Sequence, residues 1–141
     1  MIVRCISSHP SDAQIQSLGP GFRKNREFGV VIGREYLVLG LTVNVTSQTM
    51  GNGAWVDILM EPDIPTVVSV PLSLFEILDA RVSRYWELRA SDLGTITLWP
   101  PSFYRESFLE DVSDRATEAV EEFWRIHSRI EADANKIIQA E

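Results

Sequence analysis

The residues able to do chemistry in this 141-residue chain are few, and their spacing matches no catalytic or metal-binding motif. His9 precedes a proline and His127 lies in a long amphipathic segment, and neither has a serine, cysteine or aspartate neighbour in a nucleophile motif. Cys5 is the only cysteine, so an internal disulfide and a multi-cysteine zinc site are excluded. The pattern therefore predicts a protein that is not an enzyme and that has no cofactor and no metal.

Two chemical alternatives stay open. The carboxylates of Asp57, Glu61 and Asp63 flank the end of an expected strand and could bind a hard cation, although solvated charge is the usual explanation for such a group. Glycine-rich phosphate loops are absent from the sequence. An unrecognised enzyme site would need a deep pocket that gathers several of the residues His9, His127, Asp57 and Tyr36.

The charge distribution favours a protein partner over a nucleic acid. The net charge is −7, made of +2 in residues 1–27, −4 in residues 28–100 and −5 in residues 101–141. Such an acidic surface repels phosphates and attracts a basic partner. Acidity of this size would also keep an ordinary protein soluble, which is the simpler interpretation.

Size and composition predict one globular domain spanning residues 1–141. The hydrophobic fraction of 45% is ordinary for a globular protein. No apolar run approaches the roughly 20 residues needed to cross a bilayer, and the first residues lack the apolar stretch of a signal peptide. We therefore expect a cytoplasmic protein that has no contact with a membrane.

Hydrophobic periodicity predicts a mixture of strands and helices. Residues 36–45 alternate with period two, as a strand does, whereas Pro71 followed by Leu74, Ile77 and Leu78 favours a helix. Residues 83–90 are expected as a strand that sends Trp86 and Leu88 inward. The expected elements are strands at 2–7, 36–45, 54–60, 66–70, 83–90 and 95–99, and helices at 10–18, 71–80, 103–110 and from 114 onward.

Two turns should join neighbouring strands into hairpins, one at Asn52-Gly53 and one at Gly94, because these residues tolerate positive φ. Ser107 and Glu110 are spaced as a capping box. The last forty or so residues carry an apolar stripe at alternating steps of three and four, which must be buried. Its members are Leu109, Val112, Ala116, Ala119, Phe123, Ile126 and Ile130.

The predicted fold class is therefore α+β: a mostly antiparallel sheet of about five or six strands with two hairpins, a short helix after the fourth strand, and a long C-terminal helix packed on one face. The heptad-like stripe of that helix also permits pairing with a second chain, so a monomer and a weak homodimer are both compatible with the sequence.

The order of these motifs resembles the small cytoplasmic immunity proteins that bacteria encode beside contact-dependent growth-inhibition toxins. The likeness covers about residues 28 to 115. It rests on Gly33, Tyr36, Trp55, Pro71, Leu74-Phe75, Asp79, Ser83, Trp86 and Phe103-Tyr104. The resemblance implies inhibition by tight, specific and non-covalent binding to one cognate toxin domain, often a nuclease, and it assigns no inhibitory residue.

Residue character predicts which side chains would meet such a partner. Trp55 and Trp99 fall on the less apolar faces of their strands and could serve as anchors. Charged side chains and a tyrosine, with Arg84 among them, are expected on one surface. The predicted partner-binding residues are Asp57, Glu61, Asp63, Asp79, Tyr85, Glu87 and Arg89. The alternative is an acidic interaction domain, monomeric or dimeric, that has no toxin partner.

Overall fold

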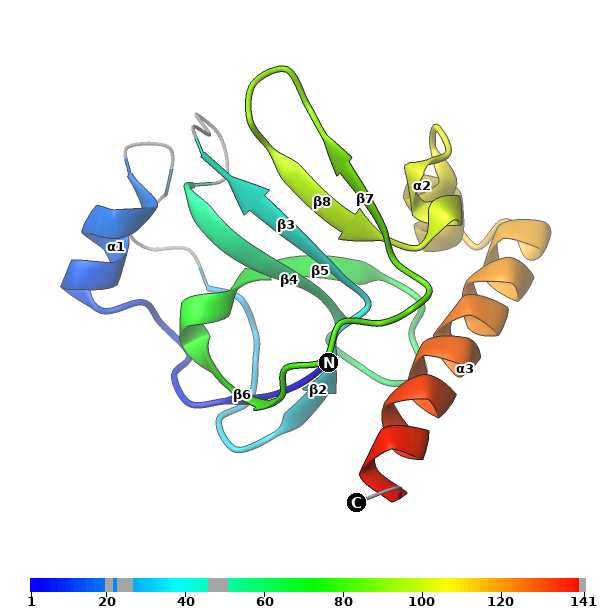
Figure 1. Cartoon of the computed structure of the whole chain (residues 1–141), viewed down its shortest axis with the longest axis horizontal. Coiled ribbons are helices and arrows are strands. Elements are labelled where there is room, and N and C mark those ends of the chain that lie inside the picture. Colours follow the sequence, from blue (N-terminus) through cyan, green and yellow to red (C-terminus); the bar gives the residue numbers. More distant parts are fainter. Residues whose placement is uncertain (20–21, 23–26, 46–50, 140–141) are drawn as a thin grey trace.

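The computed structural model describes residues 1–19, 22, 27–45 and 51–139, with side chains up to residue 135. The fold is α+β, as predicted (Figure 1). Its elements are β1 (Ile2–Cys5), α1 (Asp12–Leu18), β2 (Glu35–Leu37), β3 (Gly40–Asn44), β4 (Gly53–Leu59), β5 (Val67–Pro71), the 3-10 turn η1 (Leu72–Leu74), β6 (Phe75–Asp79), β7 (Glu87–Ala90), β8 (Ile96–Trp99), the 3-10 turn η2 (Pro101–Tyr104), α2 (Phe108–Ser113) and α3 (Thr117–Gln139).

The strands form two antiparallel sheets, where the sequence predicted one. The smaller sheet has the order β2-β1-β6, and the larger has the order β5-β4-β3-β8-β7. Both predicted hairpins are present, as β3–β4 and β7–β8. Gly53 and Gly94 have the positive φ that their turns require, whereas residues 46–50 of the first turn lie outside the described residues.

The predicted strand at 36–45 is split because the chain passes from one sheet to the other at Val38 and Leu39. The Val38 N–H donates to the Met1 carbonyl at 3.1 Å, and the Leu39 N–H donates to the Asp57 carbonyl at 2.8 Å. Both side chains are buried, so the period-two alternation of burial is interrupted at the break, while the sequence remains apolar there. Periodicity alone could not reveal the change of sheet.

The helix predicted at 71–80 is wrong. Pro71 ends β5, η1 makes a single turn, and β6 then pairs with β1. The expected apolar stripe is not a buried face, because Ile77 is 47% exposed and Leu78 is exposed as well. The free edge of β1 supplies hydrogen-bond partners from far away in the chain, and this pairing overrides the local helix pattern.

The strand predicted at 83–90 begins only at Glu87. Ser83 to Trp86 form a turn closed by a 3.2 Å hydrogen bond from the Trp86 N–H to the Ser83 carbonyl. Leu88 was predicted to point inward, but it is 61% exposed. The reason is positional: β7 is an edge strand, and no described element covers this face of it.

Two hydrophobic cores hold the molecule together. The first lies between the two sheets and includes Val3, Trp55, Val56 and Phe75, with Leu18 of α1 at its side. Trp55 is fully buried there, so its predicted role as a partner anchor is wrong. Figure 1 shows α1 and α3 on opposite sides of the molecule.

The second core joins the larger sheet to the C-terminal helices. Phe123, Ile126 and Ile130 of α3 pack with Leu39 and Leu59 of the sheet side. The predicted apolar stripe of the C-terminal helix is thus confirmed at these three positions, whereas Ala116, just before its start, is exposed. The N-terminal helix is confirmed too, starting at Asp12 behind a Ser11 capping box.

The predicted helix at 103–110 is replaced by η2 and α2. Ser107 does precede α2, but its backbone is left-handed with φ 60° and its side chain makes no capping hydrogen bond. Arg115, with φ 64°, is also left-handed and lies in the bend between α2 and α3. The expected break near 114 is confirmed, and the expected capping box is wrong.

Candidate functional site

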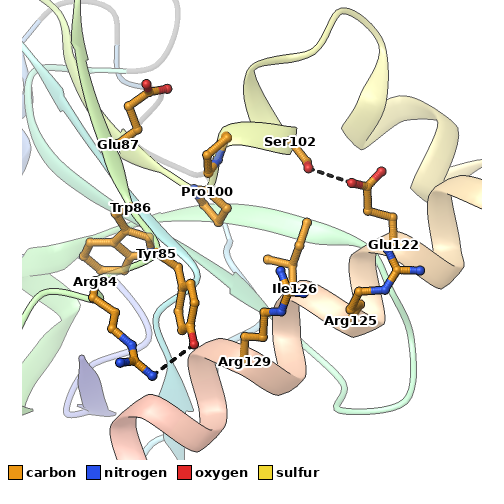
Figure 2. Close-up of a pocket in the computed structure, with 11 residues that line it drawn as sticks. Arg84, Tyr85, Trp86, Glu87, Pro100, Ser102, Glu122, Arg125, Ile126 and Arg129 are labelled. Atoms are coloured by element: carbon orange, nitrogen blue, oxygen red, sulfur yellow. Dashed lines mark hydrogen bonds between the residues drawn. The ribbon is translucent and has the colours of Figure 1, made fainter.

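A groove of about 440 Å³ opens between the start of β7, the start of η2 and α3 (Figure 2). Its walls come from segments that are distant in the sequence, at 84–87, 100–102 and 122–129. The buried ring of Pro100 stiffens one side, and Ile126 of α3 forms the apolar floor opposite. The groove therefore depends on how α3 is docked against the larger sheet.

Arg84 is attached to α3, which fixes the turn before β7. Its guanidinium lies 3.3 Å from the Asp133 carboxylate, and its backbone N–H also donates to that carboxylate. The guanidinium donates to the Tyr85 hydroxyl at 3.1 Å and lies over the Tyr85 ring. Arg84 is nevertheless exposed, so its remaining N–H groups face the solvent of the groove.

Arg125 and Arg129 extend from α3 on the other wall, one helical turn apart (Figure 2). Neither forms an ion pair with another residue in the described part of the chain. Guanidinium groups bind carboxylates and phosphates through paired N–H donors. This wall can therefore bind an anionic group, in a protein whose net charge is −7.

Two aromatic residues add apolar contact area to the groove. Tyr85 is half-buried and packs on the second core, and Trp86 is half-buried against the first. The indole N–H of Trp86 is buried and has no acceptor among the described residues. A buried donor without a partner destabilises a protein by about 1–3 kcal/mol, so an acceptor from a bound molecule would be favourable at this position.

Glu122 forms the rim of the groove. It accepts a hydrogen bond from the Ser102 hydroxyl at 2.9 Å and is ion-paired with Arg105. Burial acts to raise the pKa of Glu122, but the bonds from Ser102 and Arg105 outweigh burial and leave its pKa below the usual value. Glu122 is therefore an ionised carboxylate held in a defined orientation.

A second concavity of about 370 Å³ lies on the other side of Glu122, between α2 and α3. We call residues 105–122 the acidic corner. Its charged residues are Glu106, Glu110, Asp111, Asp114, Glu118, Glu121 and Glu122, opposed by Arg105 and Arg115. Seven acids against two bases give −5 in this segment, and most of these carboxylates are exposed. A basic groove and an acidic concavity thus adjoin at Glu122.

The structure distributes the predicted partner-binding residues over several places. Tyr85 and Glu87 line the groove, and Arg89 donates to Glu87 at 3.0 Å. Glu61 lines a separate cavity of about 520 Å³, and Asp63 is exposed in the turn between β4 and β5. Only the residues at 85–89 therefore form one surface with the groove.

Asp79 and Asp57 are placed apart from that surface. Asp79 is bonded to Arg81, and this contact lowers the Asp79 pKa. Asp57 is 3% exposed and accepts hydrogen bonds from Ser69 and from the Trp99 indole N–H at 2.9 Å. Its carboxylate is part of the packed interior, so Asp57 is too deeply buried to make the predicted contact with a partner.

The cavity that contains Glu61 also contains two residues of the alternative enzyme site, Tyr36 and His127. Burial lowers the pKa of His127, and Glu131 partly opposes that shift. His9 and Asp57 do not line this cavity. Among the described residues, no group of three or more histidine, cysteine, aspartate or glutamate side chains could hold a metal ion.

The sequence prediction missed Arg125, Arg129 and Glu122. As basic residues of the predicted C-terminal helix, the two arginines are explained locally by the helix dipole, which favours cations toward the C-terminal end. Their spacing of four places like charges on one helix face, which destabilises an isolated helix by a few tenths of a kcal/mol. This repulsion between Arg125 and Arg129 was a signal in the sequence that the two residues have a role beyond helix stability. The role could not be identified without the structure, because it depends on Arg84 in the opposite wall of the groove.

Comparison with protein-family models, curated proteins and solved structures finds no match to this chain. No helix in the described residues is long and apolar enough to cross a membrane.

Proposed function

We propose that this chain is an immunity protein that binds a cognate toxin domain and neutralises it by non-covalent occlusion. The observation that carries the proposal is the pair of adjoining concave surfaces, one with arginine and aromatic residues and one with carboxylates. A surface of this mixed character suits another protein better than a nucleic acid, whose phosphates would meet the acidic corner.

The groove has the residue types that dominate binding energy in protein interfaces. Arginine, tyrosine and tryptophan are enriched at the centre of such interfaces, particularly in concave and partly desolvated places. Tyr85, Trp86 and three arginines meet in this groove. We expect it to receive an acidic or carbonyl-bearing side chain of the toxin.

The acidic corner suits the basic surface of a nuclease. An enzyme that binds phosphates places lysine and arginine in its substrate channel, and carboxylates of an inhibitor can take the place of those phosphates. The exposed carboxylates Glu118 and Glu121 lie at the start of α3, where nothing among the described residues covers them. We therefore propose that the acidic corner covers the substrate channel.

The first test uses the toxin domain encoded beside this chain's gene. The two purified proteins are mixed, the complex is isolated by size-exclusion chromatography, and the nuclease activity of the toxin is measured. We expect a stable complex and loss of activity. Full toxin activity in the presence of excess partner, or no complex, would contradict the proposal.

The second test locates the binding surface by charge reversal. The double variant Glu118→Lys/Glu121→Lys should weaken toxin binding by about 10- to 100-fold, because two attractive contacts become repulsive. The control Glu27→Lys/Glu35→Lys changes the net charge equally but at exposed sites outside the acidic corner. Equal weakening by both double variants, measured by calorimetry, would show that only the total charge matters and would remove the acidic corner from the interface.

The alternative function is an acidic interaction domain without a toxin partner. The homodimer that the sequence permits would form through the apolar stripe of the C-terminal helix. Phe123, Ile126 and Ile130 of that stripe are buried in the second core. Self-association would therefore need a different surface.

A further inference from the structure

The outer edge of β7 has no strand partner among the described residues. β7 is the last strand of the larger sheet and pairs only with β8. All four of its residues are exposed. Figure 1 shows the β7–β8 hairpin projecting from the body of the molecule. An exposed edge of this kind is a template for another strand.

An apolar row crosses the sheet and ends at this edge. Leu41 of β3 pairs with Leu98 of β8, and Leu98 pairs with Leu88 of β7. Exposure increases toward the edge, where Leu88 is exposed and Leu93 of the following turn is 79% exposed. The row therefore ends at the exposed side chain of Leu88, which a further strand added to the same sheet would cover.

The backbone of β7 offers its outward groups at Leu88 and Ala90. The carbonyls of Glu87 and Arg89 accept hydrogen bonds from Tyr104 and Thr97, so they point toward β8 and η2. Antiparallel strands alternate the direction of their hydrogen-bonding groups from one residue to the next. The N–H and carbonyl groups of Leu88 and Ala90 therefore point toward the empty edge.

We propose that a second copy of this chain pairs with β7 in antiparallel orientation, around a two-fold axis at Leu88. In this register Leu88 lies opposite Leu88 of the partner subunit, and the outward N–H and carbonyl groups of these two residues bond each other. The apolar row then continues from one copy into the other. The two larger sheets join into one.

Charge complementarity selects this register. A two-fold axis at Leu88 places Glu87 opposite Arg89 of the partner subunit, and the reverse pair is equivalent. An axis at Glu87 or at Arg89 would instead oppose two like charges. The edge strand is thus complementary to itself in one arrangement.

The pairing has a consequence for the groove. Glu87 lines the groove, so Arg89 of the partner subunit would lie at its entrance. The dimer would add a guanidinium to the wall that already contains Arg84. The inference goes beyond the proposed function. A protein that binds the toxin domain as a monomer would exclude the dimer but would still perform the proposed function.

Mass measurement over a range of concentrations tests the dimer directly. Light scattering and sedimentation equilibrium should show a mass that rises from 15.9 kDa toward twice that value between micromolar and millimolar protein, because the paired strands are short. Leu88→Pro removes an outward N–H, which an edge strand tolerates, and should leave a folded monomer. A wild-type protein that stays monomeric at millimolar concentration, or a dimer unaffected by Leu88→Pro, would overturn the proposal.

A charge swap tests the register. Glu87→Arg and Arg89→Glu should each weaken dimerisation by about 5- to 10-fold, because each opposes two like charges across the axis. The double variant Glu87→Arg/Arg89→Glu restores opposite charges and should restore dimerisation. Failure of the double variant to recover, while circular dichroism shows native structure, would exclude this register.

Discussion

Asp57 is a carboxyl group in the packed interior of the larger sheet. It accepts hydrogen bonds from Ser69 and Trp99, and Gly40 leaves room for it because a side chain there would collide with Trp99. Burial raises the Asp57 pKa above its ordinary value of 3.8, and the hydrogen bonds from Ser69 and Trp99 only partly oppose this shift. The folded protein therefore holds this proton more tightly than the unfolded chain does.

The pH dependence of stability should reveal this proton. Because the folded-state pKa is raised, the stability that Asp57 contributes is full below pH 3.8 and is lost as the pH rises through the folded-state pKa. Asp57→Asn cannot ionise, so its free energy of unfolding relative to wild type should increase over that range, by about 1.4 kcal/mol for each unit of pKa difference. Urea denaturation at several pH values measures the difference.

Asp79→Asn is the matched control. Arg81 lowers the Asp79 pKa, so the contribution of this residue is present above pH 3.8 and is lost as the pH falls. Relative to wild type, this variant should become less stable as the pH rises, opposite to Asp57→Asn. Parallel curves for the two variants would contradict the assignment of a raised pKa to Asp57.

At the scale of elements, α2 begins just after one left-handed residue and ends just before another. Ser107 precedes its first residue, and Arg115 lies two residues beyond its last. A residue with a Cβ is strained by about 1–2 kcal/mol in this conformation. The short helix is retained because Phe108 and Val112 are buried in the second core.

Replacing Ser107 with glycine should stabilise the protein. Glycine relieves the left-handed strain, and the higher entropy of the unfolded chain offsets part of the gain, so we expect a net increase of about 0.5–1 kcal/mol in the free energy of unfolding. Glu110→Gly, inside α2, should instead destabilise by up to about 1 kcal/mol. Thermal and urea unfolding of both variants compare them. Destabilisation by Ser107→Gly would show that the serine side chain has a role that the structure does not explain.

At the scale of the whole molecule, charge is segregated. The acidic corner has a net charge of −5, while Arg84, Arg125 and Arg129 gather in the adjoining groove. Under the proposed function, long-range attraction of a basic partner would depend on the first surface, and short-range recognition would depend on the second. The two contributions respond differently to salt.

If the chain binds a toxin domain as proposed, the rate of association should therefore decrease as salt increases. Raising NaCl from about 0.05 to 0.5 M should reduce the association rate constant by about tenfold or more, with little change in the dissociation rate constant. Stopped-flow fluorescence measures the first and surface plasmon resonance the second. An association rate that is independent of salt would contradict electrostatic steering by the acidic corner.

Much of the fold could be predicted from local patterns. The β7–β8 hairpin follows from Gly94 and flanking alternation, and the C-terminal helix follows from its apolar stripe. The prediction failed at Pro71 to Asp79, where pairing with β1 outweighs a helical spacing. It failed at Leu88 because an apolar residue in an alternating segment does not reveal whether its strand lies at the edge of a sheet.

The sequence by itself determined the chemical inventory: the excess of carboxylates in the C-terminal third, the scarcity of histidine and cysteine, and the α+β class. Only the tertiary structure decided which charges adjoin. Arg84 and Arg129 are 45 positions apart in the chain, yet the docking of α3 makes them opposite walls of one groove, while Asp57 is sealed inside. Local spacing describes one element at a time, whereas a binding surface is created by long-range packing between elements.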